Sequence, residues 1–515
     1  MDKQYIPSIG KDVIESLTVG MYEDSRFIFR EYIQNSADQI DKAIKEGLIK
    51  KPQGEIHIQI DADKRTILIE DNATGIPQDQ VQPILQNIAA STKIRGIDKG
   101  FRGIGRLGGL AYCEKLIFET SYKGEASKTV LTWDAALLRN LINNRNQKEE
   151  AVDVIQKVTH VQQLPEKSDE HYFKVLLQGV TVEELLNKEE IGTYLSMVAP
   201  LPFATSFIYK KQIADELKKE GISLDEYNIY LNTEQLFKGY STYIYDGDHQ
   251  NKKKADEIID IIFFKELDEN KNLLYWGWYG VSGFNRQLKS INHARGFRLR
   301  KSNIQIGSEY ALQKLHRDKR FNFYFFGEIH GMSNDLIPNS RRDYFIENAA
   351  YNSFEKKLRN YFHTHIHKLC FTAADINTAV RKMEDLMTFQ EEFKEKQRKG
   401  FNDKQEHAEY VEKFEAKKEE ALKAKRKIER IEQDAQNDNG EPIKKILNRV
   451  TQPEVSAGIE KLKMPKSSNL RLRTDKMNLS NKEKTLLTRV FGLIREVIEA
   501  DTAEHLIQRI EEELK

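Results

Sequence analysis

The sequence contains only two cysteines, Cys113 and Cys370, among its 515 residues. Two cysteines cannot build a disulfide framework or a cysteine-based metal cage, and so low a count is typical of a reducing compartment. Long apolar runs are also missing, since stretches such as residues 261–264 fall far short of the ~20 residues that a membrane-spanning helix needs. Residues 1–10 lack the apolar segment of a signal peptide. We therefore expect a cytoplasmic protein that does not contact the membrane.

An excess of charge of one sign is also missing, because 81 Lys and Arg face 80 Asp and Glu, for a net charge of +1. This balance argues against a generally basic nucleic-acid-binding surface and against an acidic tail, and leaves a local basic patch open. Aromatic residues make up 10% of the chain, which excludes disorder of the whole sequence. At roughly 150 residues per domain, the length predicts about three domains.

The first region, residues 1–185, reads as a mixture of one helix and several strands. Residues 27–45 carry apolar side chains at helical spacing, and residues 55–60 and 65–70 alternate apolar and polar side chains around a polar turn. Further strands are expected at 115–121, 128–133 and 172–177. A helix followed by a run of strands predicts an α+β fold with the helices on one face of a sheet.

A second α+β domain is expected over residues 186–375. Its predicted elements are strands at 227–231, 273–279, 297–300 and 321–329, and a helix at 353–369. Residues 376–436 are rich in Glu, Lys, Gln and Ala, which predicts a long helix or a short coiled coil, with a solvated single helix as the other reading. Residues 437–478 read as a linker.

The last region, residues 479–515, predicts two amphipathic helices. Within it, four apolar residues are spaced three to four apart and so form one stripe on a helix: Leu486, Val490, Leu493 and Val497. Such a stripe needs a partner, either this chain's own middle domain or a second subunit.

The predicted helix over residues 27–45 carries the first chemically informative segment. Glu31, Asn35 and Asp38 are four and three residues apart, so they share one helix face. A carboxamide oxygen is a ligand that Mg²⁺ accepts, and a carboxylate can deprotonate a water molecule. A polar stripe in solvent is the simpler reading, but Asn35 interrupts the apolar face.

The second segment follows the strand at 65–70, where Asp71 precedes a loop that contains Gly75. A carboxylate at a strand end can accept a hydrogen bond from an exocyclic amino group such as that of adenine. Taken alone, the segment favours the simpler reading of an ordinary Asp-Asn turn.

The third segment is a glycine-rich loop, with five glycines within residues 100–109. Glycines allow backbone N–H groups to approach anionic oxygens closely. Gly103, Gly105 and Gly108 also fit the G-x-G-x-x-G pattern, but the βαβ frame of a dinucleotide site is missing and no Asp-Phe-Gly follows for a kinase. We therefore predict a phosphate-binding loop of another kind.

One basic segment stands apart from these three. Residues 295–301 read RGFRLRK, which could contact phosphates of ATP or of a nucleic acid. A half-exposed strand is the simpler reading of the same residues.

In this order and spacing, the three segments resemble the GHKL ATPases, the superfamily of type II topoisomerases, ninety-kilodalton heat-shock chaperones, histidine kinases and MutL-type repair proteins. The likeness is closest to the heat-shock chaperones. RFIFREYIQNSADQIDKA (26–43) looks like their first ATP-site helix, LQNIAASTK (85–93) like the segment before their lid, and GFRGIGRLGGLA (100–111) like their phosphate loop. The resemblance covers residues 9–180. It implies a GHKL (Bergerat) ATP-binding α/β sandwich, then an α+β middle transducer domain and a helical C-terminal region.

The resemblance also implies roles for particular residues. Glu31 corresponds to the general base for water, Asn35 to the Mg²⁺ ligand and Asp71 to the residue that binds the adenine amino group. The ATP-binding residues so implied are Asn35, Asp38, Asp71, Gly75, Lys93, Gly100, Phe101, Arg102, Gly103, Ile104 and Gly105. LIPNSRRD (336–343) is similar to LPLNVSRE of the chaperones' middle domain, which makes Arg342 the arginine that reaches the γ-phosphate.

Two departures from the family pattern stand out. Ala73 occupies the place of the first glycine of D-x-G-x-G, and residues 172–177 lack the usual Gly-Thr beside the adenine. The Thr-mediated contact to the base is therefore in doubt, whereas the Asp71 contact is not.

The function that these observations predict is that of an ATP-dependent conformational machine that uses Mg²⁺, forms a homodimer and acts on protein clients or partner subunits. The balanced charge and the LIPNSRRD segment favour this chaperone-like output. The charged helical C-terminal region leaves a nucleic-acid-linked ATPase open, of the topoisomerase, MutL, MORC or phage-defence kind.

Overall fold

The computed structural model of the chain contains two compact units. The first comprises Met1–Val281 and Arg286–His365, and the second comprises Ser282–Asn285 and Ile366–Lys515. Within the described part of the chain, no helix is long and apolar enough to cross a membrane. The structure describes residues 9–18, 24–89, 99, 103–144, 149–248, 251–284, 286–436, 440–450 and 472–514.

The first unit is built on an eight-stranded sheet with the order β5-β4-β3-β6-β2-β1-β7-β8. Its neighbours pair antiparallel, apart from the parallel pair β1 and β7. The strands are β1 (Glu55–Asp61), β2 (Thr66–Asp71), β3 (Lys115–Ser121), β4 (Ser127–Asp134), β5 (Thr159–Pro165), β6 (Tyr172–Gln178), β7 (Asn228–Leu231) and β8 (Glu234–Gln235). The predicted strands of the first region are thus present within one or two residues of their expected bounds.

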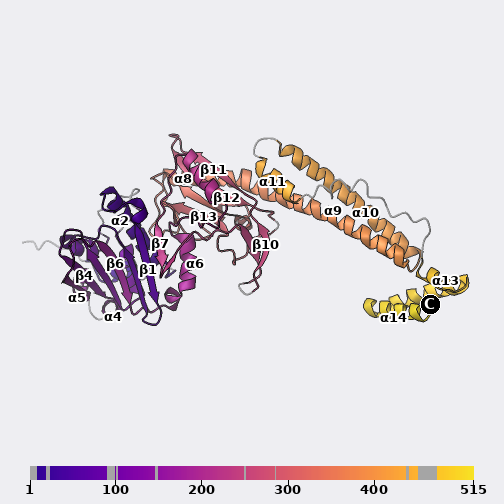
Figure 1. Cartoon of the computed structure of the whole chain (residues 1–515), viewed down its shortest axis with the longest axis horizontal. Helices are drawn as coiled ribbons and strands as arrows, with labels where there is room; N and C mark the ends of the chain where they lie inside the picture. The colour runs from indigo at the N-terminus through magenta and orange to yellow at the C-terminus, as the bar shows by residue number, and fades with distance from the viewer. Residues whose placement is uncertain are drawn as a thin grey trace, which may run out of the picture. The chain divides into compact units, whose positions relative to one another are not determined.

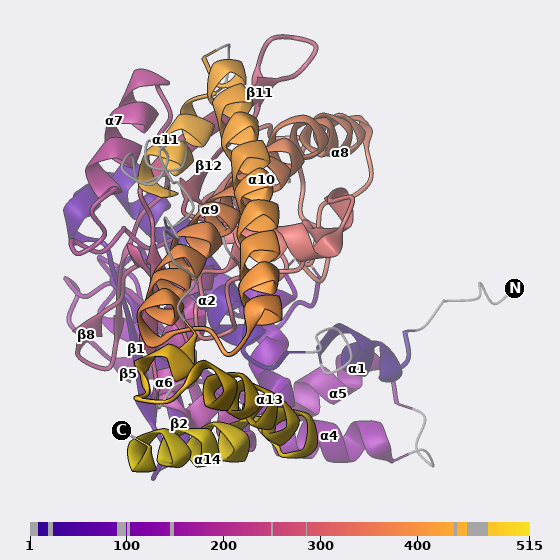
Figure 2. The same cartoon turned by 90° about the vertical axis from the view of Figure 1, so that its right-hand side faces the viewer.

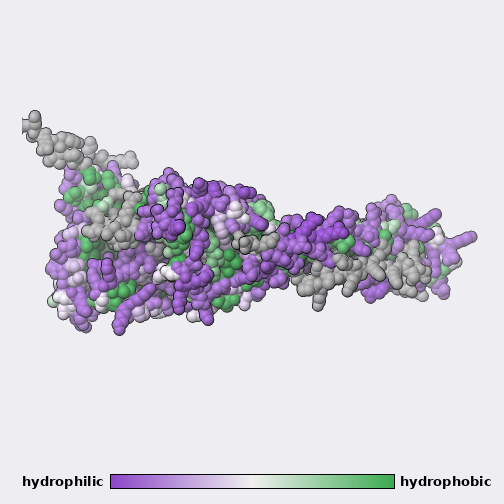
Figure 3. Space-filling view, turned by 90° about the horizontal axis from the view of Figure 1, so that it is seen from above, coloured by the Kyte–Doolittle hydropathy of each residue, from purple (hydrophilic) through white to green (hydrophobic). Residues whose placement is uncertain are grey.

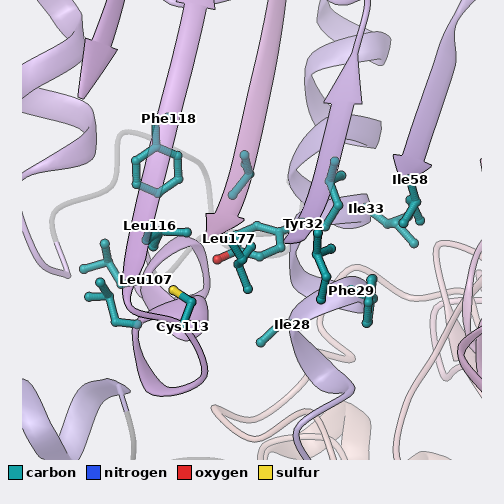
Figure 4. Close-up of a cluster of buried hydrophobic side chains, with 14 of the residues drawn as sticks. Ile28, Phe29, Tyr32, Ile33, Ile58, Leu107, Cys113, Leu116, Phe118 and Leu177 are labelled. Atoms are coloured by element: carbon teal, nitrogen blue, oxygen red, sulfur yellow. The ribbon is translucent and has the colours of Figure 1, made fainter. Parts of the chain in front are cut away.

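Helix α2 (Phe27–Lys45) packs on this sheet (Figure 1). Its apolar residues recur every three or four positions, so Phe29 and Ile33 lie in the core with Ile58 and Leu177 from the strands (Figure 4). Each fully buried side chain of this kind contributes about 1.5–3 kcal/mol. The predicted α+β fold is confirmed. The other helices up to residue 219 are α1 (Asp12–Thr18), α3 (Val81–Leu85), α4 (Ala135–Asn143), α5 (Ala151–Val158), α6 (Lys188–Val198) and α7 (Lys210–Lys219).

The predicted boundary between residues 185 and 186 lies inside the first unit. Strand β7, which we assigned to the second domain, pairs with β1 and extends the first sheet, with Ile229 opposite Ile56. The edge of β1 would otherwise expose unpaired backbone groups, and β7 satisfies them. The two regions that we predicted as separate domains therefore form a single compact unit.

A second sheet in the first unit has the order β11-β12-β15-β13-β14, and a two-stranded ribbon joins β9 and β10. The strands of the sheet are β11 (Asp260–Leu267), β12 (Leu273–Val281), β13 (Gly296–Lys301), β14 (Ile304–Gln305) and β15 (Phe326–Gly331). The ribbon consists of β9 (Tyr243–Asp246) and β10 (Lys253–Glu257), and the helix α8 (Ala349–Tyr361) follows β15 in the chain. The predicted strand at 321–329 is wrong in its first half, because Lys319–Tyr324 forms a 3-10 helix capped by the Asp318 side chain. Strand β13 is buried along Gly296–Arg300, so the half-exposed strand that we expected is also wrong.

The second unit begins with two helices, α9 (His367–Lys399) and α10 (Lys404–Asp434). Figures 1 and 2 show them side by side, and Lys382 of α9 pairs with Glu420 of α10 at 3.2 Å. Residues 376–436 are therefore an intramolecular helix pair and not one long helix. The chain reverses at Gly400, whose φ of +96° favours glycine, and Asp403 then caps α10.

Among the described residues after α10, one helix was not predicted. Helix α11 (Glu441–Val450) packs on α9 through the buried residues Ile446 and Leu447, inside the segment that we predicted as a linker. Helices α13 (Asn481–Val497) and α14 (Ala500–Glu513) are the two predicted amphipathic helices. In the view of Figure 3, most of the surface over the second unit is hydrophilic.

The second sheet encloses a group of charges that are removed from solvent. Glu328 on β15 lies 2.8 Å from Lys238 and 2.5 Å from Arg300, and all three side chains have 0% exposure. Burial by itself would raise the pKa of Glu328, but Arg300 and Lys238 hold it well below its ordinary value. The carboxylate is therefore the anion that makes two buried cations tolerable.

Replacing this carboxylate is expected to destabilise the protein strongly. In Glu328→Gln, Lys238 and Arg300 would remain buried without a counter-charge, at a cost of about 3–5 kcal/mol. Glu266→Gln is the matched control, since Glu266 pairs with Lys357 at a side-chain exposure of 42% and should cost less than about 1 kcal/mol. Urea unfolding of both variants measures the difference, and equal midpoints would contradict this account.

Candidate functional site

Helix α2 presents its polar residues as the spacing predicted. Glu31 is buried, while Asn35 and Asp38 are half-buried on the same face. The apolar face of the helix packs on the sheet, and these three side chains therefore lie on the face that points away from the sheet core. The Asp38 carboxylate accepts a hydrogen bond of 3.0 Å from the backbone N–H of Lys99, in the segment that leads into the glycine-rich loop.

The structure brings Glu31 together with Arg342. Arg342 Nε lies 3.1 Å from Glu31 Oε1, and each residue is 6% exposed. A second link runs beside it, because Arg30 Nη2 donates to the backbone oxygen of Arg341 at 3.3 Å. A carboxylate and a guanidinium that are distant in sequence thus meet in a buried pair, where their charges interact strongly.

Arg342 adopts an unusual backbone conformation at this position. Its φ is +55°, in the left-handed region that costs an ordinary residue about 1–2 kcal/mol. Its guanidinium also donates to the backbone oxygen of Lys99 at 2.5 Å. The strain is maintained by these contacts, and strain of this kind is frequent at functional sites.

The glycine-rich loop approaches Glu31 closely. A Cβ added at Gly105 would lie 2.2 Å from Glu31 Oε2, so no larger residue fits there without moving the carboxylate. A 3-10 helix over Gly105–Ala111 follows. Tyr32 ties this turn to α2, since its hydroxyl donates to Arg106 O and accepts from Gly109 N, both at 3.1 Å.

Asp71 lies at the end of β2 and is 1% exposed. Burial raises the pKa of its carboxyl to about 7, while hydrogen bonds from Ser36 and from the Ala73 amide act in the opposite direction. Its Oδ2 has no hydrogen-bond partner among the described residues. A buried acceptor without a donor is costly, and it is well suited to bind an amino group of a ligand.

Gly75 forms the turn that follows Asp71. Its φ is +66°, and an added Cβ would lie 1.9 Å from the Ser121 backbone oxygen, so the turn needs glycine. Ala73 is fully buried, and its backbone oxygen lies 2.7 Å from His171 Nδ1. The alanine at this position is therefore accommodated in the turn.

The residue opposite Asp71 on β6 is Phe173. Phe173 also pairs with Thr120 on β3 and stacks on Phe118, with ring centroids 5.9 Å apart. The Thr120 hydroxyl accepts from Ile76 N at 2.8 Å and donates to Tyr172 O at 3.1 Å. The departure noted in this strand therefore places an aromatic residue opposite Asp71 in the strand pairing, with its ring stacked on Phe118.

Several predicted site residues cannot be located. Lys93, Gly100, Phe101 and Arg102 lie outside the described residues, whereas Gly103, Ile104 and Gly105 are described.

Sequence reasoning also missed three residues that shape the site: Arg30, Tyr32 and Lys99. The Lys99 side chain lies 2.6 Å from Asp41 and 3.2 Å from Asp225, and Asp225 belongs to the region that we assigned to the second domain. A partner so distant in sequence leaves no local pattern, so spacing along the chain gave no signal for it.

Comparison with known proteins agrees with this geometry. The sequence profile of the family described as "Histidine kinase-, DNA gyrase B-, and HSP90-like ATPase" matches residues 23–167. These residues contain α2, β2, the Asp71–Gly75 turn and the glycine-rich loop. The matched segment is thus the part of the chain that carries every predicted site residue except Arg342.

Curated relatives align over the same part of the chain. Proteins named chaperone protein HtpG are 28% identical over 144 residues in Burkholderia ambifaria and 29% identical over 143 residues in Chromobacterium violaceum. The HtpG of Shewanella loihica is 27% identical over 144 residues. Each alignment covers 24% of this chain and 22–23% of the relative, so the chain spans about a quarter of these relatives.

The burial of Asp71 predicts a pH-dependent effect on stability. In the unfolded chain an Asp titrates near pH 4, whereas Asp71 in the folded protein has a pKa of about 7. The folded state therefore binds the extra proton between these values, and the stability of the parent falls as pH rises through this window. Asp71→Asn, which mimics the protonated form, should be more stable than the parent near pH 8 by a few kcal/mol and lose this advantage near pH 4.

Urea unfolding across this pH range tests the effect, with Asp61→Asn as the control of opposite sign. Hydrogen bonds from the Lys64 amide and side chain hold the pKa of Asp61 below its ordinary value. The Asp61→Asn variant should therefore be slightly less stable than the parent at pH values above about 4. A parent and an Asp71→Asn variant with parallel pH profiles would contradict the assignment of a raised pKa to Asp71.

Proposed function

We propose that this chain, whose residues 23–167 match the histidine kinase-, DNA gyrase B- and HSP90-like ATPases, binds ATP in the first unit and hydrolyses it to ADP and phosphate. The observation that carries the proposal is the buried contact of 3.1 Å between Glu31 and Arg342 beside Gly105. A base and a cation next to a glycine-rich loop are the groups that phosphoryl transfer to water requires.

The adenine end of the site is assigned to Asp71. Its unpaired buried oxygen fits the exocyclic amino group of adenine, which would satisfy it. Phe173 on the adjoining strand offers an aromatic surface at the same edge. Recognition of the base would thus combine one polar contact with apolar packing, the usual composition of a small-molecule site.

Magnesium is assigned to Asn35. Its carboxamide oxygen is a hard ligand of the type that Mg²⁺ accepts, and Mg²⁺ usually takes its remaining ligands from phosphates and water. The described residues contain no group of three or more His, Cys, Asp or Glu that could hold a metal alone, which fits an ion that arrives with the nucleotide. When bound, the ion neutralises phosphate charge.

In the hydrolytic step, Glu31 accepts a proton from a water molecule whose oxygen attacks the γ-phosphorus, while the bond to the β,γ-bridging oxygen breaks. Arg342 stabilises the negative charge on the transferred phosphoryl group. Because Arg342 now contacts Glu31, the triphosphate must compete for this guanidinium. ATP binding would thereby free the base and pull on the loop that carries Arg342, which couples the nucleotide to a conformational change.

The output that we favour is chaperone-like action on protein clients or partner subunits. The HtpG relatives and the LIPNSRRD segment with Arg342 support it, as does the balanced charge of the chain. A nucleic-acid-linked ATPase predicts a different result in one inexpensive test. An electrophoretic shift of DNA at low salt that vanishes as salt rises would favour nucleic acid over protein clients.

Removing the base tests the catalytic assignment. Glu31→Ala should still bind ATP in calorimetry but hydrolyse it ~10²-fold more slowly or worse, because a general base contributes about this much. Glu46→Ala at the other end of α2 is the matched control, since Glu46 is exposed and remote from Arg342. A Glu31→Ala variant that hydrolyses ATP at the parental rate would remove Glu31 from the mechanism.

The C-terminal helices are proposed to join two copies of the chain. In α13 the face toward α14 is built from other residues, with Phe491 buried, whereas the predicted stripe is exposed: Leu486 by 64%, Val490 by 37%, Leu493 by 60% and Val497 by 81%. Helix α13 thus has two apolar faces, and the described residues cover the one that carries Phe491.

Light scattering tests the dimer. We expect the mass of two chains for the parent and of one chain for the double variant Leu486→Glu/Leu493→Glu, because burying two carboxylates between apolar faces is unfavourable. Lys482→Glu with Glu496→Lys, which changes exposed charges on the same helix, is the control and should leave the mass unchanged. A monomeric parent, with and without a non-hydrolysable ATP analogue, would exclude the dimer.

A further inference from the structure

The first unit contains a cavity of about 880 Å³ next to the proposed catalytic pair. Its walls come from the start of α2, from α6, from β13 and the segment before it, from the turn after β14 and from the Arg342 loop. Neither Asp71, Asn35 nor Gly75 lines it, and among the described residues Arg342 is the proposed nucleotide contact that it shares. The cavity is therefore a separate feature and not the adenine pocket.

Guanidinium groups dominate the wall of this cavity. Three of its arginines have little exposure: Arg30 with 7%, Arg298 with 5% and Arg342 with 6%. The other three are more accessible: Arg26, Arg295 and Arg341. The described lining holds six arginines and five carboxylates, so the cavity carries a small positive excess in which the cations are densely clustered.

The carboxylates of the cavity leave this charge only partly balanced. Asp24 pairs with Arg26 at 2.9 Å, and Glu309 lies 3.5 Å from Arg298 and 3.6 Å from Arg295. The remaining carboxylates, Glu189, Glu190 and Asp343, are exposed to solvent. Three arginines of the wall are buried, and Glu31, which lies 3.1 Å from Arg342 and 3.7 Å from Arg30, is the buried carboxylate that the described residues place against two of them.

Arg298 shows most directly that a partner is missing. Its Nη2 donates to the backbone oxygen of His293 and its Nη1 reaches Gln305 and Glu309, both at 3.5 Å, but its buried Nε has no hydrogen-bond partner in the described part of the chain. Arg30 Nε, which lies 3.7 Å from Glu31 Oε1, is also buried without a hydrogen bond from or to the described residues. Burial lowers the pKa of Arg298, and Glu309, 3.5 Å away, opposes this only in part.

We propose that this cavity is a second ligand site, which binds a small phosphate-bearing anion between Arg298 and Arg30. Arginine is the side chain best suited to phosphate, because its planar guanidinium donates two parallel hydrogen bonds. The volume lies within the ~300–1,000 Å³ of small-molecule sites, so a ligand as large as a nucleotide fits. The segment RGFRLRK, which the nucleotide site does not use, supplies Arg295 and Arg298 to this cavity.

Occupancy of this site would also affect the ATPase, and this part rests on the proposed function. Arg30 and Arg342 line the cavity and also lie 3.7 Å and 3.1 Å from Glu31. An anion that attracts these guanidiniums would loosen their hold on the base, so the rate of ATP hydrolysis should respond to the ligand. The binding itself does not depend on ATP hydrolysis and is tested separately.

Calorimetric titration of the full chain with inorganic tripolyphosphate tests the binding. We expect saturable binding to the parent that Arg298→Gln weakens about tenfold or more, the effect of losing a charged hydrogen-bond donor. Arg341→Gln, which alters an exposed lining residue, should weaken it in the same direction if Arg298→Gln does not fold. Arg320→Gln is the control, since this side chain is 75% exposed, pairs with Asp318 and does not line the cavity.

Further arms of the experiment separate the possible outcomes. Asp71→Asn should retain tripolyphosphate binding even where it loses ATP, so a failure of the proposed ATPase site would leave this result intact. Absence of binding, or equal affinity in the parent, Arg298→Gln and Arg341→Gln, would overturn the proposal. A short single-stranded oligonucleotide that binds through Arg298 where tripolyphosphate does not would overturn it too, because the cavity would then be a nucleic-acid contact.

Discussion

The packing of α2 on the eight-stranded sheet is the constraint on which the first unit depends. The apolar face of the helix is committed to the core through Phe29 and Ile33, so the helix cannot rotate without exposing them. The other face therefore holds Glu31, Asn35 and Asp38 in a fixed direction. Glu31 then determines how close the loop at Gly105 and the guanidinium of Arg342 can come.

Two groups of buried charges in the first unit differ in whether their ion pairs can rearrange. Glu328 faces Lys238 and Arg300 in a sheet core without exposure, and Tyr240 and His330 contact the same carboxylate. The carboxylate of such a network is bonded to several buried partners, which favours one arrangement of the side chains. The pair of Glu31 and Arg342 lies instead between a helix and a strained turn, next to a large cavity. In the proposed function these partners are exchanged for phosphate oxygens, which a switch requires.

Much of the structure of residues 1–185 was predictable because its signals are local. The apolar spacing of residues 27–45 and the alternation in β1 and β2 arise within single elements, and both were read correctly. Errors appeared where the decisive partner lies elsewhere in the chain. Strand β7 has the pattern of an ordinary strand, and nothing in it indicates that it pairs with β1 across the predicted domain boundary. Likewise, residues 376–436 have one helical composition, and the reversal depends on a single glycine and the cap that follows.

The sequence by itself determined the α+β fold of the first unit, the face of α2 that carries Glu31 and Asn35, the glycine turn after Asp71 and the two helices at the C-terminal end. These features depend on periodicity and on the conformational freedom of single residues, which act over a few positions. Only the tertiary structure decided that Arg342 contacts Glu31, that Lys99 joins Asp41 to Asp225 and that six arginines surround one cavity. The reason is physical: contacts between charged groups depend on where the packed core places them, and sequence spacing carries no record of that placement.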